Sequence, residues 1–167
     1  MIIHAGRTIL IVAPIVLALV AAACSKSSNS SPSSPAPAAS TAALTITFSE
    51  NPVPYRTSGC SGATPQGWYT TARVQETAGV SFTPSTLTQK LDGNVSSLLT
   101  ESFASRFGAC SGGSFTPGII TANGTACATI GVCTTGTYSN YQFELSGTDA
   151  NGHTLTFTSP LLPFAAR

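Results

Sequence analysis

The residues best equipped for chemistry are five cysteines, and the four that follow Cys24 show no metal-binding spacing. Forty-nine residues separate Cys60 from Cys110, 16 separate Cys110 from Cys127, and 5 separate Cys127 from Cys133. Structural zinc sites usually place paired ligands about two to four residues apart, so we expect two disulfides and no metal or other cofactor. Three connectivities are possible. We favour Cys127 with Cys133, and Cys60 with Cys110, because the last two share the flanking pattern Cys-Ser-Gly.

His153 is the candidate for acid–base chemistry, four residues after Asp149 and beside a predicted turn. No Gly-x-Ser-x-Gly motif presents a nucleophile to it. Paired carboxylates could serve a glycosidase if they lay about 5 to 10 Å apart across a cleft. The six acidic residues are scattered: Glu50, Glu76, Asp92, Glu101, Glu144 and Asp149. We therefore expect a non-catalytic domain, with a small extracytoplasmic hydrolase using His153 or paired carboxylates as the alternative.

Aromatic residues are the remaining candidates for ligand binding. Trp68 and Tyr69 are neighbours in an alternating segment, so they must point to opposite faces of a strand, with Trp68 the natural core residue. Tyr55, Tyr69 and Tyr138 offer flat apolar rings with polar tips, which suit stacking on sugars or anchoring a protein partner. Ordinary packing within strands is the competing interpretation of all three tyrosines.

The elements that would position these residues are strands, because the hydrophobic pattern has a period of two. Leu44 to Phe48 and Trp68 to Gln75 alternate clearly, and further alternating runs span 80–82, 87–91, 141–145 and 155–161. Turn-forming residues over 147–152 predict a hairpin between the last two runs. From Asn94 to about Gly108 we expect a short helical connection, with Val95, Leu98, Leu99 and Phe103 on one side.

The closing hairpin resembles that of immunoglobulin-like domains. Its first arm carries Tyr141, Phe143 and Leu145, and its second carries Leu155, Phe157 and Leu161, all directed to one face. The likeness extends loosely over 44–164 through the number of strands and the placement of turns. It implies an all-β, immunoglobulin-like antiparallel β-sandwich with one short helical connection, stapled by disulfides. It implies nothing about activity.

Residues 1–23 have the three parts of an export signal: Arg7, an apolar stretch with Pro14 in its middle, and three alanines before Cys24. The segment Ala21-Ala22-Ala23-Cys24 resembles the lipobox of bacterial lipoproteins, in which the cysteine is lipidated and becomes the N-terminus. Ala21 departs from that family, which most often has Leu there. The resemblance implies an extracytoplasmic protein anchored in a membrane by acyl chains on Cys24. Ser25 at the next position favours the outer membrane where there is one.

The mature chain divides into a tether and one domain. Residues 24–43 comprise Cys24 and a stretch rich in Ser, Pro and Ala that cannot form a core, and residues 44–167 contain the predicted sandwich. At about 3 Å per residue, the tether could hold the domain roughly 50 Å from the lipid. A passive spacer is the simpler interpretation.

Charge and composition narrow the classes of partner. Only 8% of residues are charged, and without Arg7 the seven basic residues become six, which balance six acidic ones. Scattered, balanced charge argues against nucleic-acid binding, which needs a basic surface. We therefore expect an envelope lipoprotein whose domain binds an envelope protein or polysaccharide. A purely structural lipoprotein without a specific ligand stays open.

Overall fold

The structure, a computed structural model, describes residues 40–60 and 64–167. The predicted signal segment, Cys24 and most of the predicted tether lie outside these residues. Within them, no helix is long and apolar enough to cross a membrane. The elements are β1 (Leu44–Phe48), β2 (Tyr55–Arg56), β3 (Gly67–Glu76), β4 (Phe82–Leu91), β5 (Asn94–Val95), α1 (Phe103–Arg106), β6 (Thr125–Cys133), β7 (Asn140–Asp149), β8 (Thr154–Thr158) and β9 (Leu162–Pro163).

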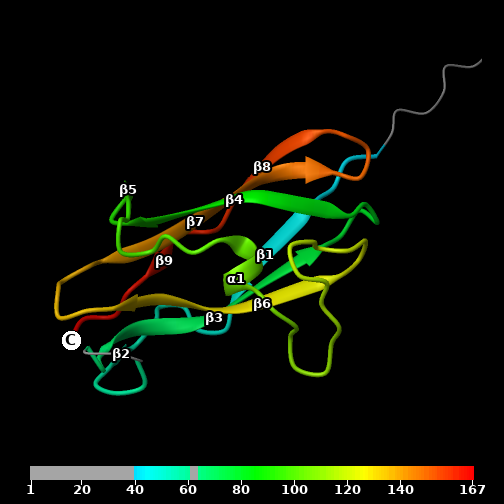
Figure 1. Cartoon of the computed structure of the whole chain (residues 1–167). Coiled ribbons are helices and arrows are strands. Elements are labelled where there is room, and N and C mark those ends of the chain that lie inside the picture. The colour runs from blue at the N-terminus through cyan, green and yellow to red at the C-terminus, as the bar shows by residue number, and fades with distance from the viewer. Residues whose placement is uncertain (1–39, 61–63) are drawn as a thin grey trace, which may run out of the picture. The chain divides into compact units, whose positions relative to one another are not determined.

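These strands form two antiparallel sheets, which Figure 1 shows as two layers. In sheet A, β3 is central, with β1 and β2 along one side and β6 along the other. In sheet B the order is β5, β4, β7, β8, and β9 also pairs with β7. The longer strands β1, β3 and β6 therefore form one sheet, and β4, β7 and β8 form the other. Strands A, B and E and strands C, F and G are divided in the same way between the two sheets of an immunoglobulin-like sandwich. The predicted all-β sandwich is confirmed.

The core lies between the sheets because alternate residues of each strand face inward. On β3, Trp68 is only 1% exposed, while Tyr69 points to the outer face and is half-buried. The Trp68 indole donates a hydrogen bond to the carbonyl oxygen of Ala165 at 2.8 Å and stacks on Phe164. From sheet B, Phe143 is fully buried against this layer. The predicted separation of Trp68 and Tyr69 onto opposite faces is confirmed.

The predicted helical connection from Asn94 is wrong in its first half. Asp92 and Gly93 both have positive φ, 49° and 79°, and make a tight turn that pairs Asn94 with Leu91 as strand β5. Asp-Gly favours this kind of hairpin turn, which reverses the chain before a helix can begin. The helix is the single turn α1, capped by Ser102, whose side chain accepts a hydrogen bond from the Ser105 amide.

Strand β6 is absent from the sequence-based expectations. It pairs with β3 along nine residues, from Gly67 opposite Cys133 to Gln75 opposite Thr125. Its inward positions include Ala126 and Ala128, whose small side chains give a weak alternating signal. Gly131 adopts φ 134° within the strand. A Cβ at this position would lie 2.0 Å from the carbonyl oxygen of Trp68, so the close approach of β3 requires glycine.

The two predicted disulfides are present, but the favoured connectivity is wrong. The bonds join Cys60 to Cys133 and Cys110 to Cys127. Cys127 and Cys133 lie on the continuous strand β6, six residues and therefore about 20 Å apart, far beyond the reach of a disulfide. Cys127 instead faces the segment that leaves α1, where its amide and carbonyl groups pair with those of Gly108.

Candidate functional site

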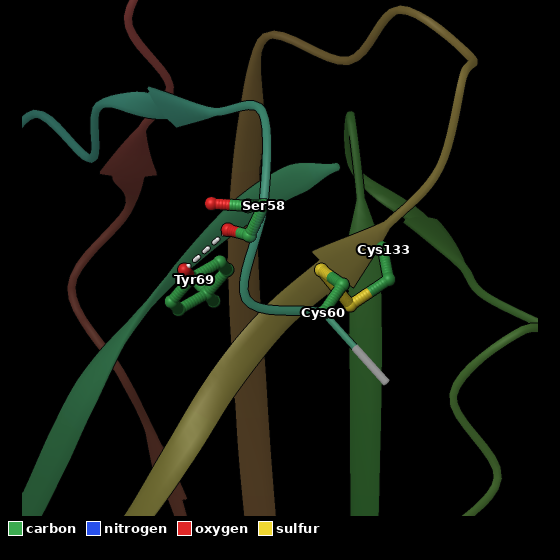
Figure 2. Close-up of a disulfide and its surroundings, with 4 residues drawn as sticks. All are labelled: Ser58, Cys60, Tyr69 and Cys133. Carbon is green, nitrogen blue, oxygen red and sulfur yellow. Dashed lines mark hydrogen bonds between the residues drawn. A yellow bond between two sulfur atoms is a disulfide. The ribbon is translucent and has the colours of Figure 1, made fainter. Parts of the chain in front are cut away.

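Tyr69 is the predicted ligand-binding residue with the most developed surroundings. Its hydroxyl donates a hydrogen bond to the carbonyl oxygen of Ser58 at 2.8 Å, which fastens the loop after β2 to the outer face of sheet A (Figure 2). Gly59, with φ 101°, makes this approach possible, because a Cβ there would lie 2.0 Å from the Tyr69 hydroxyl oxygen. Tyr69 is therefore held in one position.

The same loop is also attached covalently. Cys60 is joined to Cys133 at the end of β6, with a Cα–Cα distance of 5.7 Å, and Figure 2 shows this disulfide beside the Tyr69 hydrogen bond. Cys133 in turn lies opposite Gly67 at the start of β3. The loop is thus attached both to the central strand β3, through Tyr69, and to its neighbour β6, through Cys133, so the surface around Tyr69 is held in place by two strands.

An ion pair lies against one side of Tyr69. The Arg56 guanidinium is 5.1 Å from the centre of the Tyr69 ring, and its Nη2 is 2.6 Å from Oε1 of Glu50. The hydrogen bond to Glu50 is the main reason that the pKa of Arg56 is raised, so this guanidinium stays charged. Here the surface is hollowed by about 460 Å³, and the other lining residues carry hydroxyl groups: Ser49, Thr70, Thr71 and Thr129.

A second hollow of about 400 Å³ also has Tyr69 and Thr129 in its lining. It adds Arg106, from α1, and the backbone of β6 at Gly131. The Nη1 atom of Arg106 lies 2.9 Å from Oε2 of Glu101, so this side also carries an ion pair. We call the two adjoining hollows the Tyr69 groove. It presents a tyrosine, hydroxyl groups, the Arg56–Glu50 pair and Arg106, whose partner Glu101 lines a neighbouring hollow.

The other two predicted tyrosines lie elsewhere. Tyr55 packs edge-on against Trp68 with ring centres 4.9 Å apart, and the guanidinium of Arg167 covers it at 4.8 Å. Tyr138 is partly buried and lines a separate hollow beside β5. The structure therefore brings none of the three tyrosines together. Only Tyr69 lies between two hollows.

His153 and Asp149 form a pair at the turn between β7 and β8. The Nδ1 atom of His153 is 3.0 Å from Asp149 Oδ2, and the Asp149 side chain also accepts hydrogen bonds from the amides of Ala42, Asn151 and His153. Burial alone would raise the pKa of Asp149, but these hydrogen bonds outweigh it and lower the pKa to about 2. No serine or threonine hydroxyl is among the hydrogen-bond partners of the His153 ring in the described residues. The arrangement fixes a turn and the entry of the chain into β1.

Glu76 has a similar structural role in sheet A. Its carboxylate is buried and accepts hydrogen bonds from the amides of Ala43, Ala78, Gly79 and Asn123. Burial tends to raise the pKa of Glu76, but the four amides together lower it. Glu76 from sheet A and Asp149 from sheet B therefore bind the two residues that precede β1.

The remaining carboxylates also have partners. Glu144 pairs with Lys90 at 2.7 Å, and Asp92 accepts hydrogen bonds from the amides of Ser139 and Asn140. In the described part of the chain, no group of three or more His, Cys, Asp or Glu side chains could hold a metal ion.

No protein-family model, curated protein or solved structure matches the chain.

Sequence reasoning selected Tyr69 but missed Arg56, Glu50 and Arg106. Only 8% of the residues are charged, and this rarity was the signal that could have singled these side chains out. Arg56 reaches Tyr69 through the pairing of β2 with β3, and Arg106 reaches the same surface beside β6; the sequence pattern predicted neither β2 nor β6.

Proposed function

We propose that this chain is a membrane-anchored cell-envelope lipoprotein whose non-catalytic β-sandwich binds polysaccharide in the Tyr69 groove. The anchor is the lipidated Cys24 expected from the lipobox-like sequence. The observation that carries the binding function is the fixed Tyr69 ring between two polar hollows. An aromatic ring beside hydroxyl and ion-pair groups supplies both kinds of contact that sugars make, apolar packing and hydrogen bonding.

The position of the groove fits presentation to the envelope. Tyr69 is near the start of β3, whereas Glu76, at the other end, holds the residues that enter β1. The two residues are seven positions apart on the strand, or about 23 Å. Figure 1 shows β2, which carries Arg56, at the end of the sandwich opposite the hairpin of β7 and β8. Because the chain enters the domain beside Glu76, the groove lies at the end of β3 away from the predicted tether.

Co-sedimentation tests this proposal. The oxidised full-length protein, in detergent, is mixed with purified sacculi and with envelope polysaccharides, and the bound fraction is measured for wild type, Tyr69→Ala and Tyr69→Phe. We expect Tyr69→Ala to lose most binding. Tyr69→Phe should retain much of it, because the ring remains although the hydrogen bond to Ser58 is lost.

Tyr138→Ala is the matched control, because it removes a tyrosine from a separate hollow. Melting curves of all variants separate lost binding from lost folding. Equal losses in Tyr69→Ala and Tyr138→Ala, or no binding of the wild type to any polymer, would contradict the proposed groove.

A protein partner is the second candidate, and a different observation favours it. Val95 and Leu98 are 68% and 62% exposed, the most exposed large apolar side chains in the described part of the chain. Both line the hollow beside Tyr138. Such exposed apolar residues are typical of protein contacts. Crosslinking in the native membrane should then yield a discrete partner in wild type and lose it in Leu98→Ser.

A further inference from the structure

The described residues contain two buried side-chain nitrogens without a hydrogen-bond partner, and both belong to the Tyr69 groove. They are the Nε atoms of Arg56 and Arg106. Arg56 lines one hollow and Arg106 the other, with Tyr69 common to both. A buried donor left without an acceptor costs about 1 to 3 kcal/mol, so two at one site call for an explanation.

The two guanidinium groups have further unused hydrogen-bonding capacity. Each has five N–H donors, and in each only one nitrogen contacts a glutamate: Nη2 of Arg56 and Nη1 of Arg106. The side chains are 37% and 25% exposed, so a ligand in the groove can reach the outer nitrogens. The groove thus offers several arginine N–H donors beyond those that the two glutamates use.

The neighbouring glutamates determine which acceptor fits. Oε1 of Glu50 and Oε2 of Glu101 are within 2.9 Å of the arginine nitrogens, so a ligand carboxylate that approached either guanidinium would also approach a negative charge. Like charges at such distances repel, whereas a neutral carbonyl accepts a hydrogen bond without that penalty. Burying a neutral amide also requires less desolvation than burying an ion.

We infer that the Tyr69 groove binds an N-acetylated amino-sugar polysaccharide, with acetamido carbonyl oxygens accepting hydrogen bonds from Arg56 and Arg106. This inference rests on the proposed function and specifies its ligand. An acetamido N–H can donate to Glu50, which lines the first hollow, and an acetyl methyl group can pack against the Tyr69 ring.

The test compares two oligosaccharides that differ in one substituent. Chito-oligosaccharides carry an acetamido group where cello-oligosaccharides carry a hydroxyl, and isothermal titration with the full-length protein gives both affinities. We expect the acetylated hexamer to bind at least roughly tenfold more tightly, because it offers the outer arginine nitrogens a carbonyl acceptor that the cello-hexamer lacks. Deacetylated chito-oligosaccharide, which bears ammonium groups, should bind no better than the cello-hexamer. Sacculi and chitin particles in parallel distinguish two sources of the same acetamido chemistry.

The variants Arg56→Met and Arg106→Met remove the donors while keeping an apolar stem. Each should reduce the preference for the acetylated hexamer severalfold. Arg73→Met is the matched control, because Arg73 is an exposed arginine on the same outer face of β3, outside the groove. It should leave the preference unchanged.

Several results would overturn the inference. Equal affinity for the two hexamers, tighter binding of polygalacturonate, or an unchanged preference in both Arg56→Met and Arg106→Met would each do so. If the wild type bound both hexamers equally and Tyr69→Ala abolished that binding, the inference would fail while the proposed function stood. Loss of all polysaccharide binding in the wild type would reject both.

Discussion

Changing Tyr141 to Phe tests the polar contact at the centre of the sandwich. The Tyr141 hydroxyl donates a 2.7 Å hydrogen bond to Oε1 of Gln89, and the two residues are 0% and 1% exposed. Burial raises the pKa of Tyr141, so the phenol stays protonated and remains a donor. Tyr141→Phe leaves the Gln89 oxygen buried without a donor, which should lower the free energy of unfolding by about 1 to 3 kcal/mol.

Urea unfolding followed by tryptophan fluorescence measures this loss, because the buried Trp68 is the only tryptophan. With an m-value of about 2 kcal/mol/M, the midpoint should fall by about 0.5 to 1.5 M. Gln89→Leu should show a similar loss, since it leaves both the Tyr141 hydroxyl and the Leu99 carbonyl without a partner. The double variant should lose about 1 kcal/mol less than the sum of the single losses. Additive losses, or a cost below about 0.5 kcal/mol for Tyr141→Phe, would refute the reasoning.

Three further predictions concern acid stability, backbone geometry and disulfides. The pKa of Asp149 is lowered from 3.8 to about 2, so its stabilising contribution is present above pH 3.8 and is lost as the pH falls toward 2. Between pH 6 and pH 2, the melting temperature should therefore fall less steeply in Asp149→Asn than in wild type. Equal slopes would count against this role of Asp149. Gly131→Ala should lower the free energy of unfolding by more than about 2 kcal/mol, because its Cβ would clash with β3. Gly108 has open space around it, so Gly108→Ala should lower that free energy by less than about 0.5 kcal/mol. Similar urea midpoints for the two variants would argue against this account of β6. Removing the bond between Cys110 and Cys127, which encloses a short loop, should cost about 3 kcal/mol in the same unfolding assay, and peptide mapping without reduction should recover these two cysteines together rather than in bonds to other cysteines.

The fold was predictable from the sequence wherever inward positions carry large apolar side chains. Strand β7, with Tyr141, Phe143 and Leu145 buried in alternation, has the pattern that the sequence predicts, and so has β3 with Trp68. The runs at 80–82 and 87–91 were expected as separate strands. They belong largely to β4, whose register shifts between Pro84 and Thr86 and interrupts the alternation.

The errors share one cause: short-range patterns do not report long-range pairing. Alanines and Gly131 concealed β6, and without β6 the spacing of Cys127 and Cys133 suggested a loop closed by a disulfide. The same omission separated Arg106 from Tyr69, since only the pairing of β3 with β6 places them at one groove. The sequence thus predicted the outward-facing Tyr69 but not the charged groups beside it.

Chemical-shift mapping tests most directly whether the Tyr69 groove binds polysaccharide. Isotopically labelled protein is titrated with soluble glycan fragments released from sacculi, and backbone amide shifts are followed. We predict that the largest changes occur at Tyr69, Thr71, Thr129 and Gly131, with smaller changes on the outer face of sheet B. Saturable changes confined to sheet B or to the hollow beside Tyr138, with the groove amides unmoved, would contradict the account.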